Sequence, residues 1–150
     1  MTSSVVRMTI GLAAWGACLA GALAIADVPG DLGHAICGPW GCAPSMQALL
    51  ACHLAWFVAL VPPAVMLTRW KKASGATLRR VGLLAAGLAA SALLAILLHE
   101  RLVWWPDATE LQQGHFWERY GYVVATTVDV PAVQVLLAGF GLWLAGRRRA

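Results

Sequence analysis

The sequence predicts an all-α membrane protein, an antiparallel bundle of four transmembrane helices in a single domain, 1–150. Four apolar stretches, at about 9–26, 46–68, 81–98 and 120–145, support this prediction. Each is long enough, or nearly so, to cross a hydrocarbon core about 30 Å thick. The composition agrees, because 60% of the residues are hydrophobic and 12% are charged. Soluble domains carry about 25% charged residues.

The basic residues indicate how the chain is oriented. Arg101 and Arg119 are the only two in the connections at 27–45 and 99–119. The other nine lie near the two termini and between the second and third stretches: Arg7, Arg69, Lys71, Lys72, Arg79, Arg80, Arg147, Arg148 and Arg149. Since positive charge collects on the cytoplasmic side, we expect a multi-pass protein of the cell inner membrane with both termini cytoplasmic. We interpret these residues as anchors near lipid headgroups, so the expected partner is the lipid bilayer and not nucleic acid.

The first and third stretches contain small residues in rows, which let helix backbones approach closely within a membrane. The rows have four-residue spacing: Ala13, Ala17 and Gly21; Gly16, Ala20 and Ala24; Gly82, Ala86 and Ala90; Gly87, Ser91 and Ala95. They predict a compact bundle without indicating which helices are neighbours. Ala24 and Ala26 also resemble the end of a signal peptide, but the apolar run is long for a signal. We therefore expect an uncleaved first helix.

Local signals predict where the second and fourth helices begin and end. Ser45 can cap the second helix, and Pro62 with Pro63 should kink or end it because two backbone donors are missing. Asp129 and Pro131 interrupt the fourth stretch. We expect one continuous, kinked helix there. The alternative is a helix that restarts with Asp129 as its N-cap, which would leave about 16 residues to span the membrane.

The second outer connection has the composition of an interfacial segment. Asp107 and Glu110 have the spacing of a capping box, and Gly114 can stop a helix. We expect a short interfacial helix at about 108–113. A cluster of aromatic residues accompanies it: Trp104, Trp105, Phe116 and Trp117. We interpret this aromatic cluster as a belt at the membrane interface, with a docking surface for a partner or a hydrophobic ligand as the alternative.

Two cysteines predict a disulfide in the first outer connection. Cys37 and Cys42 flank Gly-Pro-Trp-Gly, on the side where an inner-membrane protein meets an oxidising compartment. Closing so small a ring should stabilise the fold by about 2 kcal/mol. A redox-active pair is the alternative, although such motifs usually have two residues between the cysteines and this loop has four.

The same region offers a candidate metal site. The ligand types are crowded into 20 residues: His34, Cys37, Cys42, Cys52 and His53. Thiolate and imidazole suit copper or zinc. A disulfide would remove two of the thiolates, so the disulfide and the metal site are competing hypotheses. No cofactor is firmly implied.

The ionisable residues His53 and Asp129, and the amide Gln134, fall well inside the second and fourth apolar stretches. His53 and Asp129 lie at comparable depths, about 10–14 Å from the outer ends of their helices at 1.5 Å per residue. They could pair, with Gln134 one turn deeper. Ionisable groups inside a membrane usually face the protein interior and find a partner. We expect a structural polar clasp between the second and fourth helices; a proton relay or part of a ligand pocket is the alternative.

These patterns predict a location better than an activity. The sequence has no phosphate-binding loop, nucleophile elbow or paired catalytic carboxylates, so a non-enzymatic role is the first expectation. We expect a small structural or accessory membrane protein, for instance a subunit of a membrane complex or of a homo-oligomer. The alternatives are a metal-binding or thiol-redox protein that uses the Cys/His cluster, and a transporter-like protein that uses His53 and Asp129.

Overall fold

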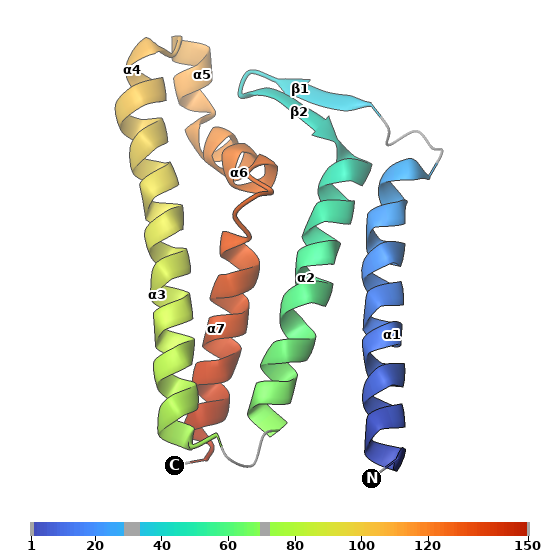
Figure 1. Ribbon diagram of the computed structural model, residues 1–150. Coiled ribbons are helices and arrows are strands. Elements are labelled where there is room, and N and C mark those ends of the chain that lie inside the picture. Colours follow the sequence, from blue (N-terminus) through green and yellow to red (C-terminus); the bar gives the residue numbers. More distant parts are fainter. Residues whose placement is uncertain (1, 29–33, 70–72, 150) are drawn as a thin grey trace.

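The computed structural model describes residues 2–28, 34–69 and 73–149, which are mostly helical. Four long helices lie alongside one another, with both chain termini at the same end (Figure 1). They are α1 (Thr2–Ala24), α2 (Met46–Arg69), α3 (Gly75–His99) and α7 (Ala132–Arg147). The shorter elements gather at the opposite end: η1 (Ile25–Asp27), β1 (Ala35–Gly38), β2 (Gly41–Ser45), η3 (Glu100–Trp104), α4 (Trp105–Asp107), α5 (Glu110–Gly114) and α6 (Phe116–Thr126). Lys71 and Lys72, part of the basic group, lie outside the described residues.

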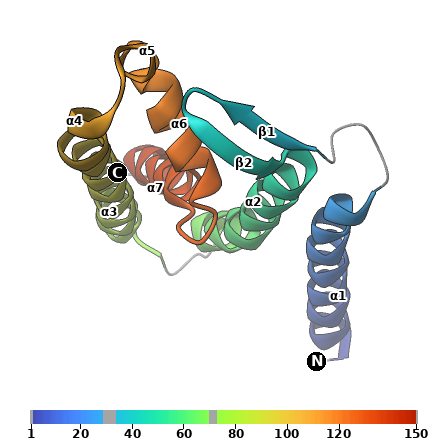
Figure 2. The same cartoon turned by 90° about the horizontal axis from the view of Figure 1, so that it is seen from above.

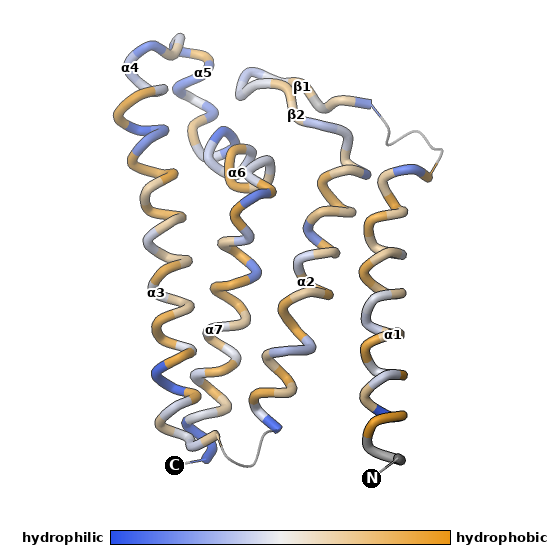
Figure 3. The backbone as a smooth tube through the Cα atoms, viewed as in Figure 1, coloured by the Kyte–Doolittle hydropathy of each residue, from blue (hydrophilic) through white to orange (hydrophobic). Residues whose placement is uncertain are grey.

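Within the described residues, three helical segments are long and apolar enough to cross a membrane: Val5–Asp27, Met46–Arg69 and Gly75–Asp107. Apolar residues follow the long helices, while polar residues collect toward the two ends of the molecule (Figure 3). The fourth apolar helix, Ala132–Arg147, has 16 residues and is therefore about 24 Å long at 1.5 Å per residue. It is the one long helix in the described chain that is short of a full span.

The expectation of a continuous fourth helix is wrong. The predicted segment at 120–145 divides into α6, which ends at Thr126, and α7, which begins at Ala132. Pro131 has no N–H to donate and disfavours a helical conformation at the preceding Val130. The restart at Asp129 is also wrong in detail, because Pro131 occupies the N-cap position and no side chain caps α7.

The third helix extends further than predicted. After α3, the chain continues through the π-helical turn η3 and then α4, so that the helical column ends at Asp107 instead of near residue 98. The chain turns back toward the other end of the molecule only after α4, at the start of α5 (Figure 1). The capping box of α5 exists, but it is formed by Thr109 and Gln112 and not by Asp107 and Glu110.

Helix α2 begins as predicted but passes through its prolines. The Ser45 hydroxyl accepts a hydrogen bond from the Ala48 N–H at 3.3 Å. Pro62 and Pro63 lie inside the helix, which ends at Arg69. The missing N–H of Pro62 frees the Val58 carbonyl four residues earlier. The Trp15 indole N–H of α1 donates to that carbonyl at 2.6 Å, so a neighbouring helix satisfies the group that the proline leaves open.

Helices α3 and α7 pack backbone to backbone through small residues spaced by seven. On α3 these are Gly75, Gly82 and Ala89; on α7 they are Ala132, Gly139 and Gly146. A Cβ atom at Gly82 would lie 2.6 Å from Gly139 O, and one at Gly146 would lie 2.7 Å from Gly75 O. The two helices are antiparallel, so the small residues meet in register and the backbones touch. Nearby, Leu78 and Leu142 are buried with Ala73 in an apolar core near the termini.

Among the described long helices, α1 packs mainly on α2 and stands away from α3 and α7 (Figure 2). Its buried or half-buried residues include Trp15, Leu19 and Ala22. The predicted small-residue rows of α1 are exposed throughout, and among the described residues nothing beyond the adjacent backbone of α1 lies within 4 Å of a Cβ built at Gly16 or Gly21. The rows of α3 are used in part: Gly82 and Ala86 meet Gly139, whereas Gly87 and Ser91 are exposed.

Candidate functional site

Strands β1 and β2 form an antiparallel hairpin that an all-α prediction omits. Cys37 lies opposite Cys42, and the two are joined by a disulfide. Gly41 closes the turn with a φ of +125°, which favours glycine because a side chain is strained there. The predicted disulfide is therefore present, and it closes the hairpin close to its turn.

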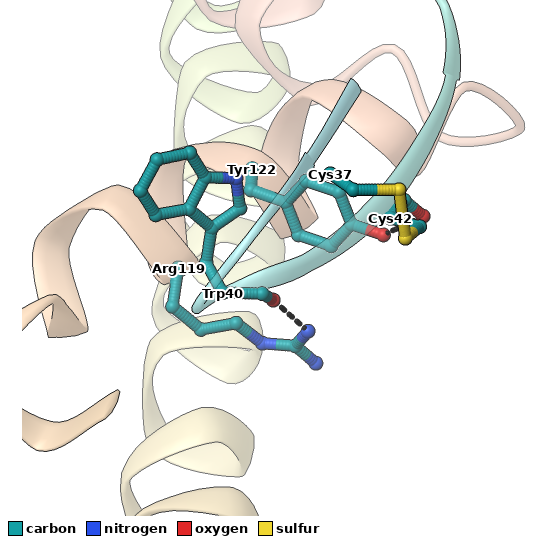
Figure 4. Close-up of a disulfide and its surroundings, with 5 residues drawn as sticks. All are labelled: Cys37, Trp40, Cys42, Arg119 and Tyr122. Carbon is teal, nitrogen blue, oxygen red and sulfur yellow. Dashed lines mark hydrogen bonds between the residues drawn. A yellow bond between two sulfur atoms is a disulfide. The ribbon is translucent and has the colours of Figure 1, made fainter. Parts of the chain in front are cut away.

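Arg119 of α6 joins this hairpin to the π-helical turn. Its Nε donates to Glu100 Oε2 at 2.7 Å, and its Nη1 donates to the Trp40 carbonyl at 2.6 Å. Three residues further along α6, the Tyr122 hydroxyl donates to the Cys42 carbonyl at 2.6 Å. Figure 4 shows Arg119 bonded to Trp40 in the turn of the hairpin, with Tyr122 next to Cys42 of β2. The guanidinium also lies 5.2 Å from the ring centroid of Trp104.

The pair formed by Glu100 and Arg119 is largely removed from solvent. The exposed fraction of the Glu100 side chain is 4%, and that of Arg119 is 20%. Charge-assisted bonds are stronger than neutral ones, and removing one partner of a buried pair costs about 3–5 kcal/mol because the other charge remains unpaired. We call residues 35–45 and 100–126 the cap. Arg119 and the disulfide together hold the cap in one arrangement.

The predicted aromatic cluster lies within the cap. Trp105 packs edge-on against Phe116 at 5.1 Å between ring centroids, and Phe116 packs similarly against Trp117 at 5.4 Å. Arg101 stacks over Trp105 at 4.0 Å. Trp104 contributes instead to the surroundings of Arg119. Phe116 is buried, whereas Trp117 is 69% exposed, so the cluster has both a packed interior and an outward surface.

A second polar arrangement surrounds the break between α6 and α7. His53 Nε2 lies 2.9 Å from the Ala125 carbonyl and donates to it, since a carbonyl only accepts. His53 Nδ1 then accepts from Gln134 Nε2 at 2.6 Å. Trp56, one turn further along α2, donates to the Val128 carbonyl at 2.7 Å. In a continuous helix, the Ala125 carbonyl would accept from residue 129. Side chains of α2 therefore satisfy carbonyls near the break that the interrupted helix does not pair, in keeping with the rule that buried backbone polar groups find a partner.

The structure separates the predicted partners His53 and Asp129. Both nitrogens of the His53 ring have other partners, and the predicted third member, Gln134, is one of them. Gln134 is 4% exposed. Asp129 is exposed, and the described part of the chain offers it no hydrogen bond or ion pair. It lies beside a cavity formed by α1, α2 and the break.

The predicted metal ligands are not assembled. Cys37 and Cys42 are disulfide-bonded and so lack free thiolates. His53 is engaged at the helix break, Cys52 is half-buried on α2, and His34 is exposed before β1. Across residues 2–28, 34–69 and 73–149, no three His, Cys, Asp or Glu residues are grouped so that they could hold a metal ion.

Four side chains that matter here did not emerge as site residues from the sequence: Glu100, Arg119, Tyr122 and Trp56. Glu100 and Arg119 contributed only to the charge distribution, although opposite charges flanking an aromatic segment are a signal for a pair. Trp56 lies three residues after His53 and so shares its helix face. An indole N–H usually finds a partner when buried, and that rule would have added Trp56 to the polar residues of this face.

Searches for similarity with family models, curated proteins and solved structures gave no match. The functional interpretation therefore rests on the chemistry and geometry of this chain.

Proposed function

We propose that this chain is a small integral membrane protein of accessory type, which presents its cap to another subunit of a membrane complex. The observation that carries this proposal is the preformed cap. A disulfide, a buried ion pair and a hydroxyl-to-carbonyl bond hold it, where a simple connection between helices would need none of them. Pre-organisation of this kind reduces the entropic cost of binding a partner.

The proposed orientation is an inner-membrane bundle of four antiparallel helices, with both termini cytoplasmic and the cap outside. Arg79 and Arg80 lie in the first turns of α3, at the same end as the termini, which agrees with the positive-inside rule. The disulfide lies at the opposite end, and disulfides persist in oxidising compartments. In this orientation α5 and the exposed Trp117 lie near the outer interface. A reporter that works only in the cytoplasm should be active when it is fused after Ala150. A reporter that works only outside the cytoplasm should be inactive at the same position.

The partner is tested by purification in mild detergent, followed by measurement of the stoichiometry of any co-purifying protein. The Cys37→Ser/Cys42→Ser variant opens the hairpin, and Tyr122→Phe removes one bond to it. Both should lower the yield of a stoichiometric partner, the double variant more. Tyr120→Phe is the matched control: its hydroxyl, on the same helix, donates to the Leu93 carbonyl of α3 at 3.2 Å and not to the hairpin.

Size-exclusion chromatography and thermal melting of each variant verify that the chain remains folded. Absence of any stoichiometric partner in the wild type contradicts the proposal, and so does full retention of the partner by both cap variants. Thiol labelling of intact cells adds a further readout. A cysteine pair that cycles between reduced and oxidised forms during growth would favour redox chemistry over a structural disulfide.

A further inference from the structure

The break between α6 and α7 opens a cavity that the proposed function does not use. It lies between α1, α2 and the break, and its volume is about 420 Å³. That size falls within the range of about 300–1,000 Å³ typical of small-molecule sites. Its walls include Leu19 and Leu23 from α1 and Cys52 and Trp56 from α2, and Asp129 lines it from the break.

Asp129 gives this otherwise apolar cavity a charge. Of the polar residues at the break, His53 and Gln134 bind each other, and Trp56 binds the Val128 carbonyl. Asp129 has no such partner among the described residues and does not cap α7. An unpaired carboxylate in a membrane segment is energetically costly, more so at the helix centre than near the interface. A cation that enters the cavity would recover part of that cost.

The register of α7 against α3 places the break within the membrane-spanning part of the molecule. Gly139 lies seven residues after Ala132, the first residue of α7, and it contacts Gly82, which lies seven residues before Ala89 of α3. Because the two helices are antiparallel, Ala132 is therefore level with Ala89. Ala89 lies 14 residues after Gly75, which is about 21 Å along the helix axis. The helical column of α3 continues well beyond this level, to Asp107. A ligand at Asp129 therefore lies at the level of the apolar helix surfaces and not beyond their ends.

We propose that this cavity binds a hydrophobic organic cation, an alkylamine or an alkyl quaternary ammonium compound. The charged nitrogen pairs with the Asp129 carboxylate, and the alkyl chain lies along Leu19 and Leu23. The indole of Trp56 is held in place by its bond to the Val128 carbonyl, and an aromatic face attracts cations. An anionic amphiphile of equal length would meet repulsion from Asp129. The inference is independent of the proposed partner, because the cap variants above leave every wall of this cavity unchanged.

Cys52 supplies a built-in reporter for the test. The free cysteines of the described chain are Cys18 and Cys52, and only Cys52 lines this cavity. In a Cys18→Ser background with the disulfide intact, the rate of Cys52 alkylation by N-ethylmaleimide reports access to the cavity. The probes are decyltrimethylammonium, decanol and decanoate, added to the purified protein in lipid vesicles. A ligand present at four times its Kd should slow alkylation about fivefold, because the unprotected rate is divided by 1 + [L]/Kd when only the free protein reacts.

We expect saturable protection by decyltrimethylammonium and little or none by decanol or decanoate. Asp129→Asn should abolish the difference between the probes, whereas the matched control Asp107→Asn, in the cap, should retain it. Equal protection by all three probes would show apolar occupancy without charge recognition and would overturn the proposal. Absence of protection by the cation, or protection that survives Asp129→Asn, would also overturn it.

Discussion

The α3–α7 pair and the α1–α2 pair are built from similar apolar, small-residue sequences, yet they associate in different ways. Between α3 and α7, glycines at Gly82 and Gly139 bring the two backbones into contact. Between α1 and α2, the bulky Trp15 reaches across to the Val58 carbonyl. That tryptophan lines two cavities, of about 750 Å³ and 430 Å³.

The difference shows that a row of small residues is insufficient for close packing. Both partners of the α3–α7 pair carry small residues at a seven-residue spacing, and the antiparallel register places them opposite one another. Helix α2 also carries a row of small residues, Ala51, Ala55 and Ala59, but the rows of α1 are exposed and do not face it. Close approach depends on matching rows because backbones can touch only where both helices lack bulky side chains.

The largest expected effect is at the glycine contact. Gly82→Ala places a Cβ 2.5 Å from Trp143 N and 2.6 Å from Gly139 O, so α3 and α7 must separate. We expect destabilisation by about 2 kcal/mol or more, as for overpacked cores. Gly87→Ala is the matched control: nothing lies within 4 Å of its Cβ, and alanine favours helix over glycine by about 1 kcal/mol. Unfolding in detergent should therefore shift in opposite directions for the two variants; shifts of the same sign would contradict the proposed packing.

A smaller effect is expected at the tryptophan contact. Trp15→Phe removes the donor to the Val58 carbonyl and should cost about 1 kcal/mol. Pro62→Ala restores an N–H four residues after Val58, so the carbonyl regains a partner within its own helix. The cost of Trp15→Phe should therefore be lower in the Pro62→Ala background. A double-mutant cycle on the unfolding free energy measures this coupling, and a coupling of zero would mean that the proline does not explain the bond.

The smallest effect is expected on the exposed side of α1. Gly16→Ala meets nothing within 4 Å, so the isolated protein should be unchanged or stabilised by at most about 1 kcal/mol through helix propensity. Unfolding of the purified chain in detergent provides the measurement. Clear destabilisation would reveal that this side of α1 is packed against another part of the assembly, and the contrast between the two helix pairs would have to be withdrawn.

The candidate site was predictable in parts. The six-residue segment from Cys37 to Cys42 indicated a disulfide, and the polar residues His53 and Gln134 indicated a contact between the second and fourth apolar stretches. The choice of partner was not predictable. His53 could have met Asp129 or Gln134, and the break at Pro131 decided the outcome because it exposed the Ala125 carbonyl to His53.

The sequence by itself determined the properties that depend on composition and on local chain chemistry. These are the apolar helices, the accumulation of basic residues at one end, the Ser45 cap and the close spacing of the paired cysteines. The tertiary structure alone decided which helices are in contact, that Arg119 joins Glu100 to the hairpin, and that a cavity opens beside Asp129. Such features depend on register and distance between segments far apart in the chain, and no local pattern encodes either quantity.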